Sequence, residues 1–292
     1  MPAFDTPQPI SVTVELGVGD VRITASDRTD TIVEVRPSDA AKKSDVSAAQ
    51  ETRVEYDGGR LLIKAPKGHR GLRQFSFAPG GESIDVQIAL PAGSSVRGDA
   101  GVVALRCAGR LGEFRLKTGV GEIQLDQADS LQINTGAGDI TVHRVLGHAE
   151  LATGSGAVRI GGIDATGVIK NGNGDTWIGE AGRELKVNAA NGTISVGQAH
   201  AGVAAKTANG DVRLGEVLRG AVLVETACGK LEVGIREGVA AWLDLNTHYG
   251  NVQTDLDPAR PEPGEDAVEV RARSAFGDIT VRRVRKAQPV ED

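Results

Sequence analysis

The sequence has few aromatic residues, one methionine and no long apolar run. Aromatic residues make up 3% of its 292 residues, so Val, Ile, Leu and Ala must fill the core. No window reaches the roughly 18 consecutive apolar residues of a membrane-spanning helix. The N-terminus also lacks the basic start and apolar stretch of a secretion signal. We therefore expect no membrane span and, for the chain as given, a cytoplasmic location, with surface exposure still open if a longer precursor exists.

The charge balance shows no basic excess. Lys and Arg number 33 against 39 Asp and Glu, which gives a net charge of -6. Nucleic-acid-binding domains favour a basic face and a high isoelectric point. We therefore expect no nucleic-acid partner.

Signatures of catalysis and of cofactor binding are also missing. The sequence contains no Gly-x-Ser-x-Gly elbow, no Walker loop and no Cys-His nucleophile signature. Its five histidines have no zinc-like spacing with a further ligand. We expect no catalytic residue, no cofactor and no metal site.

A glycine recurs about every eighteen residues through most of the chain. The glycines of this column that we expect to form structural turns are Gly121, Gly138, Gly156, Gly174, Gly192, Gly210 and Gly229. Apolar residues stand two and four positions after each glycine, as Val158 and Ile160 do after Gly156, and mostly polar residues alternate with them. A period of two is typical of strands with one buried and one solvated face.

The length of the repeat predicts the fold class. Helical repeats need about 33 residues or more per unit, which excludes them here. A unit of about eighteen residues cannot bury its own apolar face, so successive units must stack. The sequence therefore predicts an all-β protein, a single elongated parallel β-solenoid with about 18 residues per rung. We expect right-handed coiling, because parallel crossovers usually take that hand.

The first hundred residues follow the repeat less faithfully. Residues 11–24 resemble a rung, residues 38–52 indicate a short helix or a loop, and residues 53–65 indicate a hairpin turning at Asp57-Gly58-Gly59. The domain prediction has three parts: an N-terminal rung and irregular β cap at 1–95, solenoid repeats at 96–284, and a polar tail at 285–292.

Three units carry a specific resemblance: Thr118-Gly-Val-Gly-Glu-Ile123, Thr135-Gly-Ala-Gly-Asp-Ile140 and Thr207-Ala-Asn-Gly-Asp-Val212. With them, nearly the whole chain resembles the bacterial putative-adhesin family with β-strand repeats (domain of unknown function 4097). The resemblance implies a β-strand scaffold, and it supplies no catalytic residues to carry over.

The turns allow two interpretations. An acid follows several column glycines, as Asp175 and Asp211 do, and stacked carboxylates would attract calcium. However, the calcium-binding β-roll has a period of nine, with its Asp two residues after the glycine. We favour a glycine with positive φ and an Asp that caps the turn through its own backbone. The Thr three positions before the glycine, such as Thr118, we assign to an internal hydrogen-bond ladder in preference to an ice-binding or sugar-binding face.

Five residues are candidates for contact with a partner. Trp177 occupies an outward, polar column between Arg159 and Ser195 of the adjacent rungs, where an indole is unexpected unless the arginine stacks on it. Trp242, Tyr249 and Phe276 gather near the C-terminus, and they form either an interaction patch or a plug for the end of the core.

The cysteines, Cys107 and Cys228, are seven repeats apart and too distant for a disulfide, so we interpret each as a small packing residue.

The function prediction is a non-catalytic scaffold that binds an unknown protein or glycan through its side or end. The alternative is a polymerising, cytoskeletal-like subunit, and a less favoured one is a sugar-cleaving β-helix enzyme. Polymerisation needs two bare end rungs. Because 36–81 would cover one end and the last rung, 276–284, would run into a polar tail, we expect a monomer or small oligomer.

Overall fold

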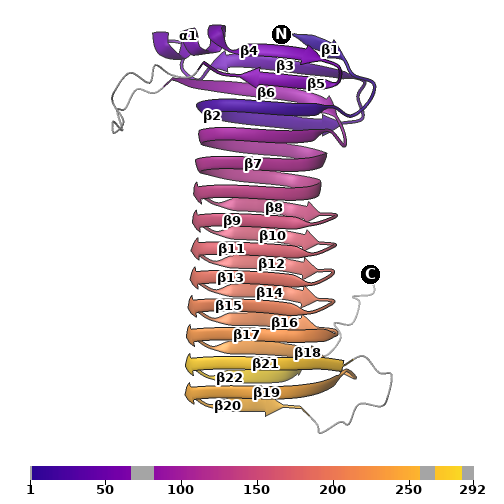
Figure 1. The fold of residues 1–292 in the computed structure, drawn as a ribbon, viewed down its shortest axis with the longest axis vertical. Helices are drawn as coiled ribbons and strands as arrows, with labels where there is room; N and C mark the ends of the chain where they lie inside the picture. Colours follow the sequence, from indigo (N-terminus) through magenta and orange to yellow (C-terminus); the bar gives the residue numbers. More distant parts are fainter. Residues whose placement is uncertain (1, 67–81, 257–266, 285–292) are drawn as a thin grey trace, which may run out of the picture. The chain divides into compact units, whose positions relative to one another are not determined.

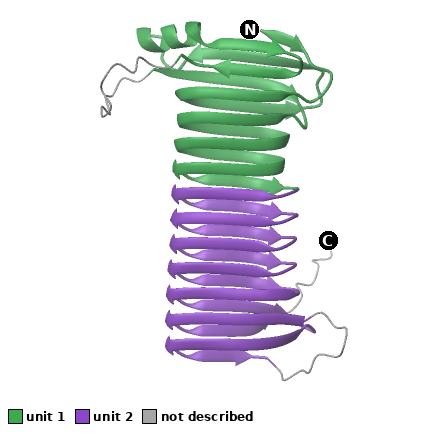
Figure 2. Ribbon diagram, viewed as in Figure 1, with its two compact units in different colours: residues 1–146 green, residues 147–292 purple. Residues whose placement is uncertain are grey.

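The computed structural model describes residues 2–66, 82–256 and 267–284 (Figure 1). They form two compact units, residues 1–146 and residues 147–292 (Figure 2). Both units are built from parallel strands that repeat in rungs, so the prediction of an all-β parallel β-solenoid is confirmed. Two segments of the sequence-based prediction, 67–81 of the cap and the tail 285–292, lie outside the described residues.

The elements of the first unit are β1 Ala3–Asp5, β2 Ser11–Ser26, β3 Asp30–Pro37, α1 Lys43–Glu51, β4 Arg53–Asp57, β5 Arg60–Lys64, β6 Ser83–Pro91, β7 Ser95–Ala137 and β8 Ile140–Val145. The predicted hairpin is β4–β5, and its turn glycines, Gly58 and Gly59, have φ values of 52° and 79°. The short helix predicted within 38–52 is α1.

Strand β2 lies between two other rungs of the first unit. Val12 pairs with Leu61 of β5 on one side and with Val96 of β7 on the other. Farther along, Val21 pairs in the same way with Val86 of β6 and Leu105 of β7. The first long strand of the chain is therefore an interior rung, buried by neighbours on both of its edges.

Antiparallel strands cover the outer edge of the β5–β6 rung. Strand β4 pairs with β5, β3 pairs with β6, and β1 pairs with β3, all antiparallel. Helix α1 is joined to β6 by Asp45, whose Oδ1 accepts the backbone N–H of Ser83 at 3.2 Å. An antiparallel layer satisfies the backbone groups of the rung below it, and it interrupts the parallel repeat that another chain would extend.

The second unit consists of β9 Ala149–Ser155, β10 Val158–Ile163, β11 Gly167–Asn173, β12 Thr176–Ala181, β13 Leu185–Asn191, β14 Ile194–Ala199, β15 Val203–Asn209, β16 Val212–Val217, β17 Gly220–Cys228, β18 Leu231–Arg236, β19 Ala240–Tyr249, β20 Val252–Asp255, β21 Ala267–Phe276 and β22 Ile279–Val284. Odd-numbered strands pair in one parallel ladder and even-numbered strands in another. The core consists of buried apolar columns between the two ladders, such as Ile160, Ile178 and Val196.

The last rungs of the second unit are out of sequence order. Strand β21 lies between β17 and β19, so Val270 pairs with both Val222 and Leu243. Strand β22 lies in the same way between β18 and β20. Figure 1 shows β21 and β22 one level inside β19 and β20. The prediction that 276–284 forms the last rung is therefore wrong.

The composition of the two rungs explains this order. Ile279 and Val281 of β22 are fully buried, whereas Val252 of β20 is 46% exposed and Thr254 stands opposite Val281. A rung in an interior position buries more apolar surface, and so removes more of it from water, than a rung at the end does. The more apolar rung therefore takes the interior place, and the polar one ends the unit.

Candidate functional site

The column glycines lie at corners between strands. Six of them have positive φ: Gly138 at 128°, Gly156 at 139°, Gly174 at 130°, Gly192 at 124°, Gly210 at 145° and Gly229 at 154°. A Cβ on Gly174 would also lie 2.3 Å from the carbonyl oxygen of Gly156. Both the conformation and the close approach of the rungs exclude a side chain there.

Gly121 differs from the other six. It lies within the continuous strand β7 and is not among the glycines with positive φ. A Cβ at this position would be 2.4 Å from the carbonyl oxygen of Val103 in the neighbouring rung. Here the close approach of two backbones, and not the turn conformation, requires glycine.

The acids after the corner glycines bind backbone groups of the next rung. The Oδ1 atoms of Asp175 and Asp211 accept the N–H groups of Thr193 at 2.8 Å and Lys230 at 2.9 Å. Among the described residues, no group of three or more His, Cys, Asp or Glu side chains is placed to hold a metal ion. Asp175 and Asp211 therefore cap backbone groups of the next rung, and the prediction that each acid caps its own turn is wrong for these two.

The Thr column is internal. Thr118, Thr207 and Thr226 are buried, and the Oγ1 of Thr226 donates to the carbonyl oxygen of Gly210 at 3.1 Å. Asn171 occupies the same column, and its Nδ2 donates to the carbonyl oxygen of Gly174 at 2.9 Å. These groups hold the corners together and are not available to a ligand.

An asparagine ladder at the same corners was missed by the sequence analysis. The Nδ2 of Asn191 donates to the Oδ1 of Asn173 at 2.7 Å, and the Nδ2 of Asn209 donates to the Oδ1 of Asn191 at 2.9 Å. The signal was present in the sequence, since each Asn stands directly before a column glycine. In-register stacking makes such a ladder possible, because identical amides then meet one rung apart.

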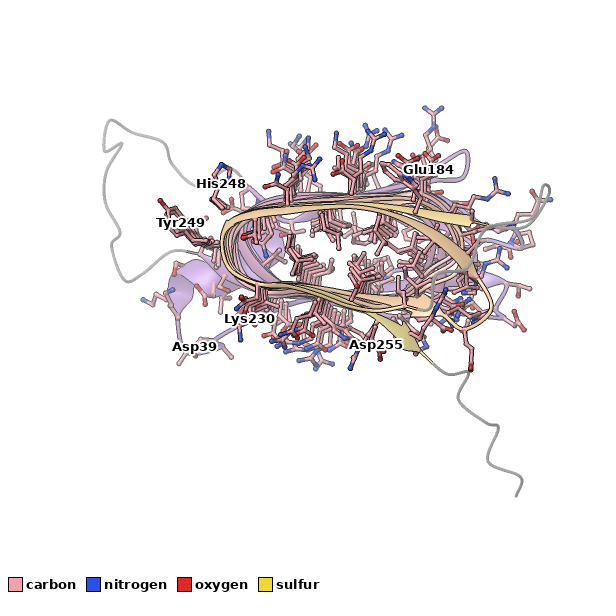
Figure 3. All side chains as sticks on the ribbon, turned by 90° about the horizontal axis from the view of Figure 1, so that it is seen from below. Asp39, Glu184, Lys230, His248, Tyr249 and Asp255 are labelled. Atoms are coloured by element: carbon pink, nitrogen blue, oxygen red, sulfur yellow. The ribbon has the colours of Figure 1, made fainter. Side chains whose placement is uncertain are left out.

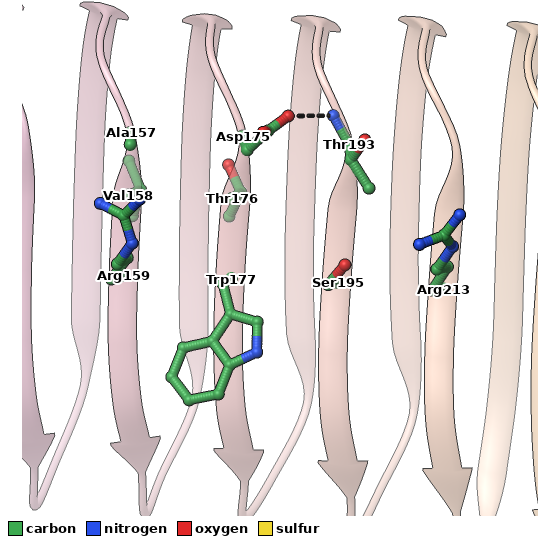
Figure 4. A pocket seen from close by; sticks show the side chains of 9 residues that line it. All are labelled: Ala157, Val158, Arg159, Asp175, Thr176, Trp177, Thr193, Ser195 and Arg213. Atoms are coloured by element: carbon green, nitrogen blue, oxygen red, sulfur yellow. Dashed lines mark hydrogen bonds between the residues drawn. The ribbon is translucent and has the colours of Figure 1, made fainter.

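The candidate site is an open hollow on the outer face of the even-numbered strands of the second unit (Figure 4). Its volume is about 380 Å³. The register places Arg159 of β10, Trp177 of β12, Ser195 of β14 and Arg213 of β16 side by side. The hollow is also lined by Asp175, Thr176 and Thr193. The predicted neighbours of Trp177 are therefore its neighbours in space.

Trp177 is 48% exposed. Its indole lies over bare backbone, because the Cη2 atom is 3.1 Å from where a Cβ of Gly179 would be. Gly197 and Gly215 follow at the same position of the next two strands. Each would place a Cβ 2.5 Å from the carbonyl oxygen of the preceding glycine, so no larger residue fits. The indole therefore borders a strip without side chains.

The two arginines of the hollow differ in their partners. Arg213 pairs with Asp211 at 3.2 Å and with Glu232 at 3.8 Å. Among the described residues, no hydrogen bond or ion pair holds Arg159, and no hydrogen bond holds the Nε1 of Trp177. In Figure 4 the Arg159 side chain extends away from the indole. The predicted stacking of Arg159 on Trp177 is absent from the described contacts, so the guanidinium and the indole are both accessible.

The aromatic residues of the last rungs are exposed and do not plug the core. Tyr249 is 69% exposed, Phe276 is 55% exposed, and their rings stack with centroids 4.9 Å apart and planes at 5°. Tyr249 projects outward at the corner of the rung (Figure 3). Trp242 is at the other end of β19, seven residues or about 23 Å away. The three residues therefore form two separate features, not one patch.

The two cysteines have different environments. Cys107 is buried, and its burial raises the pKa of the thiol to about 12, which leaves it unreactive. Cys228 is exposed at a corner, where it pairs with Asn209 and Phe276. The interpretation of Cys228 as a packing residue is therefore wrong. Its place in the polar column that holds the asparagine ladder was the available signal.

Two carboxyl groups of the second unit have a lowered pKa because each accepts a hydrogen bond from an arginine. Arg236 lowers the pKa of Glu216, and Arg273 lowers the pKa of Asp244. Both groups are therefore anionic at neutral pH, and neither can serve as a proton donor there.

The family is decided by the match to known sequences. The model of the Toastrack DUF4097 family matches residues 9–285, which cover most of each unit. The chain belongs to the Toastrack DUF4097 family. The predicted resemblance is thereby confirmed. No curated protein matches this Toastrack chain.

Solved structures resemble the Toastrack chain at low identity. A putative adhesin from Bacteroides fragilis is 12% identical, with 97% of this chain and 95% of that chain covered and a TM-score of 0.30. A putative cell adhesion protein from Clostridium sporogenes is 11% identical, with 97% and 98% covered and a TM-score of 0.21. A putative lipid binding protein from Parabacteroides distasonis is 9% identical, with 97% and 95% covered and a TM-score of 0.28. These likenesses carry no argument about what the Toastrack chain binds.

Helix α1 of this Toastrack chain has nine residues. No helix of the described ranges is long and apolar enough to cross a membrane.

Proposed function

We propose that the chain is a non-catalytic binding scaffold, which presents the hollow around Trp177 to a protein or glycan partner. The observation that carries this proposal is the half-exposed indole of Trp177 beside the free guanidinium of Arg159. Trp and Arg are the residues that most often dominate binding energy at interfaces. The exposed indole leaves apolar surface in water and contributes nothing to the core.

The rigidity of the sheet supports the same role. Strand β12 pairs in register with both β10 and β14, and Asp175 fixes the corner above the hollow through its bond to Thr193. The backbone positions from which Trp177 and Arg159 project are therefore fixed before a partner arrives. A pre-organised surface loses less conformational entropy on binding.

The chemistry of the described acids supports a role without catalysis. Glu216 and Asp244 are the acids of the second unit whose pKa is clearly shifted. Each is paired with an arginine, which lowers its pKa. A glycosidase needs a carboxylic acid with a raised pKa beside a second carboxylate. Neither Glu216 nor Asp244 suits that role.

Capture experiments with two tryptophan variants test the proposal. We expect Trp177→Ala to abolish capture of a partner from a native-cell lysate or a glycan array, and Trp242→Ala to leave it unchanged. Both residues are exposed, so neither variant should change the melting temperature by more than a few degrees. Capture that depends on Trp242 and not on Trp177 would move the binding surface to the end rung.

The polymerising alternative has one supporting observation. Strand β19 pairs with β21, β20 pairs with β22, and the outer edges of β19 and β20 meet no other described strand. Head-to-tail growth needs a second bare end. The antiparallel strands β3 and β4 cover the β5–β6 rung, which favours the binding scaffold.

A further inference from the structure

We propose that the hollow around Trp177 binds an acidic saccharide, with a sugar ring stacked on the indole and its carboxylate held by Arg159. This inference rests on the proposed function and names the ligand class of the same site. Four observations carry it: the exposed indole, the free guanidinium, the polar surroundings and the bare strip beside the ring.

The indole offers both a stacking face and a donor. Trp177 is 48% exposed, and its Nε1 has no hydrogen-bond partner among the described residues. A sugar ring has an apolar face of C–H groups and a rim of hydroxyls, so it can use the ring face and the N–H together. Beyond Gly179, which the indole covers, the strip at Gly197 and Gly215 lets such a ring lie flat, because no side chain rises from the backbone there.

Arg159 selects for charge. It is paired in register with Trp177 on the neighbouring strand, and neighbouring strands lie about 4.8 Å apart. The Arg159 side chain extends away from the indole in Figure 4, and rotation about its side-chain bonds brings the guanidinium within reach of a carboxylate on a ring that covers the indole. Arginine binds a carboxylate through two parallel hydrogen bonds, which a neutral ester cannot accept with the same strength. Arg213, already paired with Asp211, does not compete for this role.

The surroundings favour a saccharide over a protein. Hot spots of protein interfaces lie in well-packed pockets from which water is excluded. Here the hollow beside the indole is lined by Asp175, Thr193 and Ser195. The other large exposed hydrophobic residues described in the second unit all lie on β19, β20 and β21. A single aromatic platform beside hydroxyl groups matches the mixed surface of a sugar, and the Asp175 Oδ1 is already occupied by the N–H of Thr193.

Titration calorimetry with uronate oligomers tests the assignment. The probes are tetramers of galacturonate, glucuronate and mannuronate, each compared with its own methyl ester, which keeps the sugar and removes the charge. We expect at least one acid to bind, and its ester to bind about tenfold or more weakly. In a Trp242→Phe background, Trp177 is the sole tryptophan, and its fluorescence should shift on binding.

Variants separate Arg159 from charge in general. Arg159→Gln should reduce affinity for the acid to that for the ester, and Trp177→Ala should abolish binding of both. Arg282→Gln is the matched control, because Arg282 is exposed on β22 and has no ion pair among the described residues. Unchanged melting temperatures would show that the fold is intact.

The outcomes distinguish this inference from the proposed function. Equal affinity for acid and ester, or an equal loss in Arg282→Gln and Arg159→Gln, overturns the assignment of an acidic saccharide. Absence of uronate binding, together with Trp177-dependent capture of a protein or neutral glycan, overturns the inference and leaves the proposed function standing. Absence of any Trp177-dependent binding overturns both.

Discussion

The guanidinium of Arg273 on β21 donates to the carboxylate of Asp244 on β19 at 2.5 Å. The same arginine donates through Nη1 to the carbonyl oxygen of Asp244 at 2.9 Å. Strand β21 enters the unit after β19 in the chain but lies inside it in space. The ion pair therefore ties the end rung to the inserted rung.

This ion pair predicts a pH-dependent contribution to stability. Arg273 lowers the pKa of Asp244 in the folded state, below its unfolded value of about 3.9. The stabilisation is present above the unfolded pKa and is lost as pH falls through the lower, folded value. We expect Asp244→Asn to melt below the wild type at pH 7, and the difference to shrink as the pH falls below about 3.9. Asp255→Asn, at an exposed position of β20, is the control and should melt as the wild type does at pH 7.

The corner glycines predict a steric cost. Gly138→Val and Gly174→Val should each lose more than about 1 kcal/mol of unfolding free energy, because valine is strained at positive φ and its Cβ meets a carbonyl oxygen. Gly17→Ala is the control, since nothing lies within 4 Å of its added Cβ. Chemical denaturation measures all three. Equal stability of the wild type and both valine variants would contradict the assignment of these corners.

The capping acids predict that the fold is indifferent to calcium. Asp175, Asp211 and Asp278 already accept backbone N–H groups through Oδ1. A chelator should leave the melting temperature and the circular dichroism of the strands unchanged. A rise of about 10 °C in the melting temperature on adding calcium would correspond to a few kcal/mol of stabilisation by the bound ion, and it would disprove the capping role.

The two cysteines predict a stoichiometry of labelling. Cys228 is exposed, whereas Cys107 is buried with a pKa raised to about 12. A thiol reagent should therefore modify Cys228 rapidly in the native protein and Cys107 only after unfolding. Cys228→Ser should remove the fast phase, which a colorimetric assay measures. Fast labelling of that variant would show that the rung around Cys107 opens.

The covered β5–β6 rung predicts that the full-length protein forms no long filaments. Light-scattering chromatography at micromolar concentration should give a monomer or a small oligomer. Removing residues 1–95 deletes β2 and leaves the edge of β7 without its parallel partner, so association should increase. Filaments of the intact protein in negative-stain images would instead support the polymerising alternative.

Local patterns were sufficient for the rungs but not for their order. The alternation around Gly156 and Gly174 predicted β10 and β12 and their register, because side chains of a strand alternate between its two faces. The column that holds Trp177 followed from the same arithmetic. The three-part domain division and the right-handed coiling stay predictions. The environment of Cys228 was misjudged because the spacing of cysteines was considered and the polar column around Cys228 was not.

The sequence by itself determined the class of fold, since a repeat of about eighteen residues with strand periodicity has no way to bury its apolar face except by stacking. Only the tertiary structure decided which rung lies next to which. Val270 is compatible with either neighbour, Val222 or Leu243, and it contacts both because β21 is inserted between them. Parallel rungs of equal length offer equivalent edges, so the choice depends on the total apolar surface buried, which no single repeat encodes.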